Sequence, residues 1–265
     1  MKGIDNLMND PILNRVFAHY EAGVEKFSKD RVVACLLCGS QNYHLDFATS
    51  DVDTKIIIAP TFTDVAHNKP LVNEVGFMEN SEDQIAYKDI RLFIVELRKQ
   101  NVNFVETLFT EWYIRNRKFN AQWERLVDYR EEIARLNERR ALQTMIGTIR
   151  TNYSRMQKLD CGENYPAKPY ATICRVYEFI NSYISGFAYK ECLIPSNLEF
   201  IRKAKLGEFQ KDAVYEHAKS IMNSVDMYEE NILSKFSNEE NPQTLALMED
   251  VEYEIMKLAL QDAFK

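Results

Sequence analysis

The 265-residue sequence lacks any apolar run long enough to cross a bilayer, which takes about 20 consecutive apolar residues. Its first ten residues lack the apolar core of a signal peptide and the Arg/Ser-rich composition of a transit peptide. Internal repeats and low-complexity tracts are also missing from the sequence. We therefore expect a globular cytoplasmic protein that has no membrane partner.

Cysteine is scarce, and basic charge is not in excess. The five cysteines form an odd count at scattered spacings, which argues against a disulfide framework. Cys35 and Cys38 form a Cys-x-x-Cys pair, but residues three apart in a strand face opposite ways. We interpret both as buried apolar residues, with a metal or redox role as the alternative. The net charge of −7 argues against broad nucleic-acid coating and leaves a local basic groove open.

Apolar patterning divides the chain into a mixed front half and a helical back half. The predicted front-half helices span residues 11–27, 94–100 and 104–113, the predicted strands span residues 31–38, 54–60 and 84–93, and residues 61–80 are predicted to form a loop with a short helix. After about residue 116, only apolar stripes at helical spacing remain. The sequence therefore predicts an α+β fold, with a small mixed sheet and flanking helices over residues 1–115 and an all-helical half over residues 116–265.

Two short motifs flank the turn between the first two predicted strands. Gly39 and Ser40 follow the first strand, and Asp51 and Asp53 precede or begin the second. Carboxylates separated by one residue on a strand point to the same face, and Mg²⁺ takes oxygen ligands of this kind. Glycine lets the backbone approach a phosphate, and a serine hydroxyl donates to it. The pattern favours phosphoryl or nucleotidyl transfer at a metal site, although Ser-Asp-x-Asp is also common in turns and caps.

A third carboxylate is expected on a neighbouring strand, so that three side chains converge on the metal. Asp89 lies inside the third predicted strand and is the best candidate. A charged residue in a strand costs stability unless it is solvated or bound to something.

Residues 36–58 resemble the signature of the DNA polymerase β-like nucleotidyltransferase superfamily, and more closely that of the predicted nucleotidyltransferases of bacteria and their phages. That pattern runs Gly-Ser-x-x-Tyr-Gly-Leu and then Ser-Asp-x-Asp. The matching residues are Gly39, Ser40, Tyr43, Leu45, Ser50, Asp51 and Asp53, and His44 stands where glycine is usual. A weaker similarity continues over residues 101–109, where Val102 replaces a proline.

The helical half carries a further, weaker similarity to the same proteins. Their Lys-x-x-x-His-x-x-Arg pattern is matched by Lys168 and Arg175, while Thr172 replaces the histidine. By resemblance, Lys168 and Arg175 reach the triphosphate. A solvated charged helix face is the alternative for both, because they are seven residues apart.

The resemblance implies a metal-dependent nucleotidyltransferase that moves a nucleoside monophosphate from a nucleoside triphosphate to an acceptor hydroxyl and releases pyrophosphate. Asp51, Asp53 and Asp89 would be the catalytic residues and would hold two Mg²⁺ (or Mn²⁺) ions. The nucleotide-binding residues would be Gly39, Ser40, Tyr43, Lys168 and Arg175. The substrate is expected in the cleft between the two halves, and the acceptor is a small molecule, a tRNA end or a protein.

The departures at His44, Val102 and Thr172 support an alternative of another class. A catalytically inactive protein of the same fold would bind nucleotide and act as a regulator or a partner-binding module.

Two further charged residues have two interpretations each. Glu106 either supports the site or is a helix-surface carboxylate. Arg91 shares the face of Asp89, where it either neutralises a phosphate or forms an ion pair with Asp53 or Glu106.

Overall fold

The fold is known from a computed structural model, which describes residues 10–79, 81–159, 162 and 164–261. The expectations for the first nine residues and for Cys161 lie outside the described residues. Within the described part, no helix is long and apolar enough to span a membrane.

The chain forms two compact units. The described residues within 1–42, 46–136 and 240–265 form the sheet unit, and those within 43–45 and 137–239 form the helical unit. This division differs from the predicted boundary at residue 115. Strand patterns do end there, but the helices that follow at once, and the last helix of the chain, pack on the sheet unit.

A five-stranded mixed sheet forms the centre of the sheet unit, in the order β3-β4-β2-β1-β5. The strands are β1 (Val32–Cys38), β2 (Asp53–Ile58), β3 (Asn73–Phe77), β4 (Gln84–Asp89) and β5 (Tyr113–Arg115). β2 and β4 are parallel, whereas the other neighbouring pairs are antiparallel. The predicted mixed α+β class is therefore confirmed.

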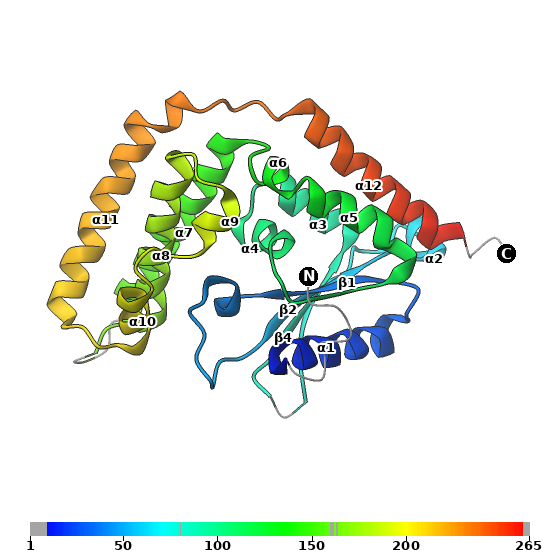
Figure 1. The fold of residues 1–265 in the computed structure, drawn as a ribbon, viewed down its shortest axis with the longest axis horizontal. Helices are drawn as coiled ribbons and strands as arrows, with labels where there is room; N and C mark the ends of the chain where they lie inside the picture. Colours follow the sequence, from blue (N-terminus) through cyan, green and yellow to red (C-terminus); the bar gives the residue numbers. More distant parts are fainter. Residues whose placement is uncertain (1–9, 80, 160–161, 163, 262–265) are drawn as a thin grey trace. The chain divides into compact units, whose positions relative to one another are not determined.

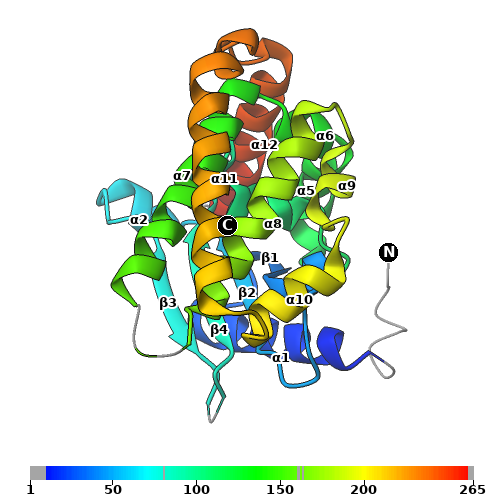
Figure 2. The ribbon, with the colours of Figure 1, turned by 90° about the vertical axis from the view of Figure 1, so that its left-hand side faces the viewer.

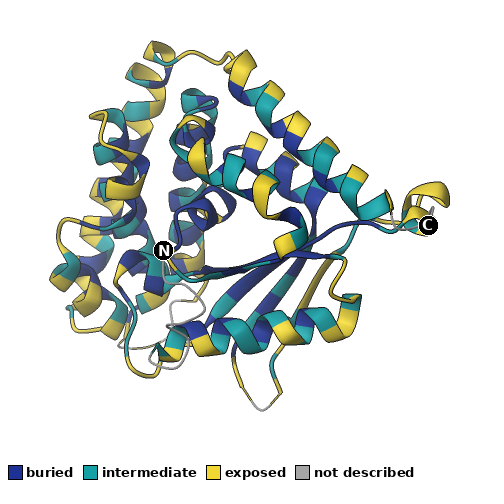
Figure 3. Ribbon diagram, turned by 45° about the vertical axis from the view of Figure 1, so that its right-hand side comes forward, coloured by how far each residue is buried: buried dark blue, intermediate teal, exposed yellow. Residues whose placement is uncertain are grey.

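Helices cover both faces of this sheet. α1 (Pro11–Phe27) lies on one face, and α3 (Ile90–Arg98), α5 (Asn120–Asp128) and α12 (Pro242–Gln261) lie on the other side (Figure 1). The remaining short helices of the unit are η2 (Ser40–Tyr43), α2 (Phe62–Ala66), α4 (Val102–Val105), η3 (Glu106–Leu108), η4 (Arg117–Phe119) and α6 (Arg130–Ala134). Because β1 is covered on both faces, all seven of its residues are buried. The side of α1 that faces away from the sheet is exposed (Figure 3).

The structure corrects three predicted elements. β3 lies within the predicted loop region 61–80 and pairs with β4. Its residues are mostly exposed, so the sequence there has no apolar pattern that would predict a strand. The predicted strand 84–93 ends at Asp89, where α3 begins. The predicted helix 104–113 is instead two short helical turns followed by the edge strand β5.

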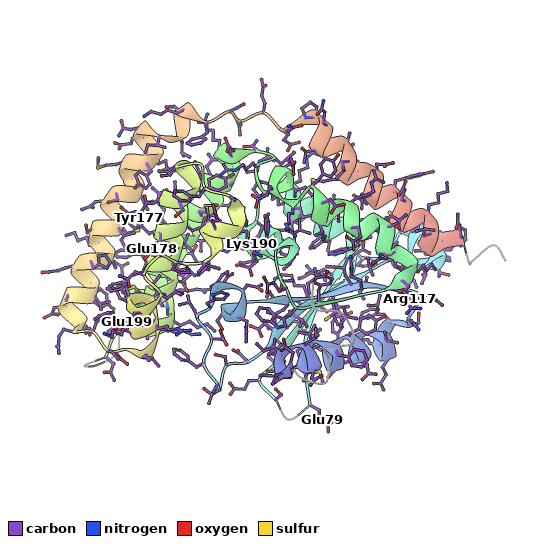
Figure 4. The ribbon with its side chains drawn as sticks, in the orientation of Figure 1. Glu79, Arg117, Tyr177, Glu178, Lys190 and Glu199 are labelled. Atoms are coloured by element: carbon purple, nitrogen blue, oxygen red, sulfur yellow. The ribbon has the colours of Figure 1, made fainter. Side chains whose placement is uncertain are left out.

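The helical unit is organised around α8. Its helices are α7 (Glu138–Lys158), α8 (Ala167–Ile184), α9 (Tyr189–Leu193), α10 (Leu198–Leu206), α11 (Lys211–Asn231) and η5 (Leu233–Lys235). α7, α8 and α11 run side by side (Figure 2). Glu178 of α8 accepts hydrogen bonds of 2.8 Å from the Ser196 amide and hydroxyl, just before α10 (Figure 4). This contact ties α10 to the central helix.

Candidate functional site

The turn after β1 places Gly39 beside the first residue of β2. Gly39 has a φ of +101°, in the left-handed region that favours glycine, and Ser40 then opens η2. Cys38 pairs with Asp53 in the sheet. A Cβ atom placed on Gly39 would lie 3.9 Å from Asp53 Oδ2. The Gly-Ser turn and the Asp53 carboxylate are therefore neighbours.

Asp51 and Asp53 flank Val52, which is fully buried against α1. Side chains alternate along an extended chain, so Asp53 faces away from α1. Asp51 is exposed, and Asp53 is half-buried with its Oδ1 accepting a 3.3 Å hydrogen bond from the Gln84 amide. Gln41 fixes the loop, because its Nε2 donates to the Asp51 carbonyl at 2.7 Å.

Asp83 and Arg15 fix residues 50–52, just before β2, through hydrogen bonds to their backbone. The sequence analysis identified neither residue. The buried Asp83 accepts from the Val52 amide at 3.0 Å and from Arg15 Nε at 2.9 Å. Arg15 Nη1 also donates to the Ser50 carbonyl at 3.1 Å. Burial raises the pKa of Asp83, but the bonds from Arg15 and Val52 outweigh this effect and hold it below its usual range.

His19 adds a third contact from α1. It is buried, its Nδ1 lies 2.8 Å from Thr54 Oγ1, and its Nε2 lies 3.6 Å from Asp83 Oδ2. Burial lowers the pKa of His19, although the nearby Asp83 opposes this effect. A signal was present in the sequence, because Arg15 and His19 are four residues apart and polar within an apolar helix.

On the face opposite α1, several charges surround Cys38. Burial raises the pKa of its thiol to about 11, the positive charge of Lys55 opposes the rise, and the negative charges of Glu106 and Asp53 add to it. Lys55 is only 8% exposed, and its Nζ lies 5.1 Å from the Phe104 ring centroid. Glu106 is 2% exposed, so its interpretation as a helix-surface carboxylate is wrong.

The cysteines behave as apolar core residues. Cys35 packs into the core beneath α1, and both Cys35 and Cys38 are buried and free. The four cysteines in the described part of the chain form no disulfide, as predicted.

Asp89 does not join Asp51 and Asp53. β2 and β4 are parallel, so Asp89 pairs with Ile58 at the end of β2 opposite Asp53. Five residue steps along a strand correspond to roughly 16 Å. The prediction that Asp89 completes a triad with Asp51 and Asp53 is therefore corrected by the strand register.

Asp89 has another role at that end of the sheet. It is 1% exposed and caps α3 by accepting from the Arg91 amide at 2.9 Å. The Arg91 guanidinium donates to the same carboxylate at 2.8 and 2.7 Å. The ion pair of Arg91 is therefore with Asp89, and not with Asp53 or Glu106 as one interpretation of the sequence expected.

No carboxylate of β4 replaces Asp89 beside Asp53. Ile85 and Tyr87 point into the core beneath α1, so Gln84, Ala86 and Lys88 take the opposite face. Within the described residues, no three His, Cys, Asp or Glu side chains are grouped so that they could hold a metal ion. Asp51 and Asp53 offer the oxygen atoms that Mg²⁺ prefers, which suits one ion shared with a phosphate.

Arg175 and Lys168, two predicted nucleotide-binding residues of the helical unit, lie in different environments. The Arg175 guanidinium lies 3.8 Å from the centroid of the buried Tyr43 ring, so these two are brought together. Lys168 is exposed. Arg202 Nη2 donates to the His44 carbonyl at 2.7 Å, which fixes the short segment that contains Tyr43.

Two residues differ from the nucleotidyltransferase pattern that the sequence resembles, and the backbone conformation at each position shows why glycine or proline would also fit there. His44, where glycine is usual, has a φ of +57°, a conformation that glycine adopts most readily. Val102, where proline is usual, is the first residue of α4 after the capping Asn101. Proline is favoured at that helix position, and other residues are accepted there. Glycine at position 44 and proline at position 102 would therefore suit the backbone that His44 and Val102 adopt.

Comparison with known proteins gives no independent assignment, because the chain matches no family model and no curated protein. The resemblance to nucleotidyltransferases therefore stays a prediction.

Proposed function

We propose that this protein is a metal-dependent nucleotidyltransferase. The observation that carries the proposal is that Gly39, in the Gly39-Ser40 turn, lies close to the Asp53 carboxylate, with Asp51 exposed nearby in the sequence. A backbone turn that accepts phosphate next to paired carboxylates is what a metal-bound triphosphate requires. Glycine is needed at the turn because of its positive φ.

In the proposed reaction, an acceptor hydroxyl oxygen forms a bond to the α-phosphorus of a nucleoside triphosphate. The bond between the α-phosphorus and the bridging oxygen breaks, pyrophosphate leaves with the bond electrons, and the hydroxyl proton passes to solvent or a base. Asp51 and Asp53 would hold a Mg²⁺ or Mn²⁺ ion, which supplies charge neutralisation. Gly39 and Ser40 would position the β- and γ-phosphates, and positioning would supply much of the rate.

A second candidate is a nucleotide-binding protein that does not transfer. The observation that favours it is the setting of Asp89, which caps α3 and pairs with Arg91 at the far end of the sheet. β4 then offers only Gln84, Ala86 and Lys88 on the Asp53 face. Binding would need the turn and the paired carboxylates alone.

The test is pyrophosphate release from each common nucleoside triphosphate with Mg²⁺ or Mn²⁺ and cell extract as the source of acceptor. The Asp51→Asn/Asp53→Asn double variant should lose at least 100-fold of the rate, on the order expected when charged transition-state contacts are removed. Asp30→Asn is a matched control, because Asp30 is an exposed carboxylate in the turn before β1. Label carried on the α-phosphate would then mark the acceptor.

Binding measured by calorimetry separates the two candidates. Metal-dependent nucleotide binding without pyrophosphate release favours the second candidate. Release that the double variant retains in full, or no nucleotide binding by the wild type, contradicts the proposed site.

A further inference from the structure

Position 86 on β4 faces the charged side of the sheet but carries only a methyl group. Ala86 pairs with Lys55 of β2, two residues along from the neighbouring Gln84 and Asp53. Ile85 and Tyr87, on either side of it, point into the core beneath α1. Ala86 is half-buried, so a longer side chain there would extend beside Lys55 and Asp53.

Two adjacent metal ions need more oxygen ligands than one, so a second ion beside Asp51 and Asp53 requires a further carboxylate from a neighbouring strand. In this chain that strand contributes an amide, a methyl group and an ammonium from Gln84, Ala86 and Lys88. Lys55 follows Asp53 by two residues on the same face of β2, and the charges of both act on Cys38. A second dication there would meet the positive charge of Lys55 and would gain no carboxylate ligand from Gln84, Ala86 or Lys88.

Lys55 is held in this position by its surroundings. It is 8% exposed, its charge acts on the Cys38 thiol, and its Nζ lies 5.1 Å from the centroid of the Phe104 ring. The buried Glu106 acts on the same thiol, so a compensating negative charge lies close by. These contacts keep the ammonium on the Asp53 face of the sheet, where a free lysine would extend into solvent.

We infer that the site takes a single divalent cation together with the nucleotide, and that Lys55 is the fixed cation in place of a second ion. The inference rests on the proposed function, and it replaces the expected two-ion arrangement with one ion held by Asp51 and Asp53. Lys55 is a positioning residue for the nucleotide anion rather than a group that reacts.

The test is the stoichiometry and spectrum of Mn²⁺ bound in the presence of a non-hydrolysable nucleoside triphosphate analogue. Equilibrium dialysis counts the ions, and electron paramagnetic resonance distinguishes an isolated Mn²⁺ from a spin-coupled pair. Wild type should bind one ion per chain with an uncoupled spectrum. Neither readout requires turnover.

A gain-of-ligand variant makes the assignment of position 86 falsifiable. Lys55→Gln/Ala86→Asp removes the ammonium and adds a carboxylate beside Asp53, so it should bind two ions with a coupled spectrum. Lys55→Gln/Ala86→Asn is the matched control, which has the same side-chain size without the charge and should bind one. Thermal unfolding monitored by circular dichroism shows whether each variant keeps its fold.

Each outcome decides the inference. One ion in the wild type and the control, with two in the carboxylate variant, supports it. Two coupled ions in the wild type, or a folded carboxylate variant that stays at one ion, overturns it. If the wild type binds the nucleotide analogue without Mn²⁺, or binds neither, the proposed function fails together with the inference. This outcome can be told apart from failure of the inference alone, in which the wild type binds two coupled ions or the folded carboxylate variant binds one.

Discussion

At the scale of single residues, the site depends on side chains behind it as much as on those that face the substrate. Asp83 is 5% exposed and receives hydrogen bonds from Arg15 and from the Val52 amide, which lies between the two candidate metal ligands. Arg15 in turn binds the Ser50 carbonyl. The residues that fix the loop before β2 therefore come from α1 and from the position just before β4.

The change Asp83→Asn should lower the free energy of unfolding at pH 7 by about 1–3 kcal/mol, because it weakens charge-assisted hydrogen bonds to Arg15. The depressed pKa of Asp83 stabilises the fold above about pH 4, the usual carboxyl range, and this stabilisation is lost as the pH falls through the folded-state pKa. The difference between wild type and variant should therefore shrink on acidification. Urea unfolding at pH 7 and at pH 3 measures it, with the exposed Glu82→Gln as control. An equal difference at both pH values would contradict the ionised interaction.

At the scale of elements, the junction of β4 and α3 shows how a helix cap can end a strand whose apolar alternation continues beyond it. Residues 84–93 alternate as a strand would, yet α3 begins at Ile90. The Asp89 carboxylate accepts from the Arg91 amide and pairs with its guanidinium, which stabilises a helix start at this point. The charge that suggested a catalytic carboxylate in a strand is explained by this helix cap.

Replacing Asp89 by alanine should therefore cost about 1–3 kcal/mol of stability, from the lost cap and the lost partner of Arg91. Its affinity for Mn²⁺ with nucleotide should stay within about twofold of the wild type, because Asp89 lies at the other end of β2 from Asp53. Chemical denaturation and calorimetry measure the two quantities. A folded Asp89→Ala protein that no longer binds Mn²⁺ would restore Asp89 as a ligand.

Local sequence pattern predicted the elements that have clear apolar periodicity and failed for those held by long-range pairing. The predictions of α1, β1 and β2 are confirmed, because each buries a recognisable stripe or run. β3 and β5 escaped prediction because they are short strands at the sheet edges, and the exposed residues of β3 carry no apolar pattern.

The same limit applies to the candidate site. Gly39 and Asp53 lie within one short motif, so the sequence alone indicated that they belong together. Which β4 residue stands beside Asp53 depends on strand register, and periodicity within one segment cannot give a register between two. Asp89 was therefore preferred, and the importance of Ala86 and Lys55 emerged only from the paired strands.

At the scale of the whole molecule, the sheet unit is closed by residues from the far end of the chain. α12 packs on α3 and α5, and its Met248, Val251 and Ile255 are completely buried. Ion pairs of 2.8 Å from Arg98 to Glu240 and 2.6 Å from Arg125 to Asp250 add to this contact. Such exposed pairs are each worth at most about 1 kcal/mol, so apolar burial provides most of the attachment.

The division into two units predicts which helices should lose protection from amide exchange when a cavity is made in one of the two cores. Ile255→Ala in α12 should cost about 2–5 kcal/mol and should raise amide exchange in α3 and α5 while leaving α7 and α8 protected. Ile201→Ala in α10 is the matched variant, because Ile201 is equally buried but belongs to the helical unit, and it should expose amides of α8 instead. Hydrogen-exchange mass spectrometry reads both patterns in the intact chain. If both variants loosen all helices alike, the chain unfolds as one cooperative body, and the separate stability of the sheet unit is contradicted.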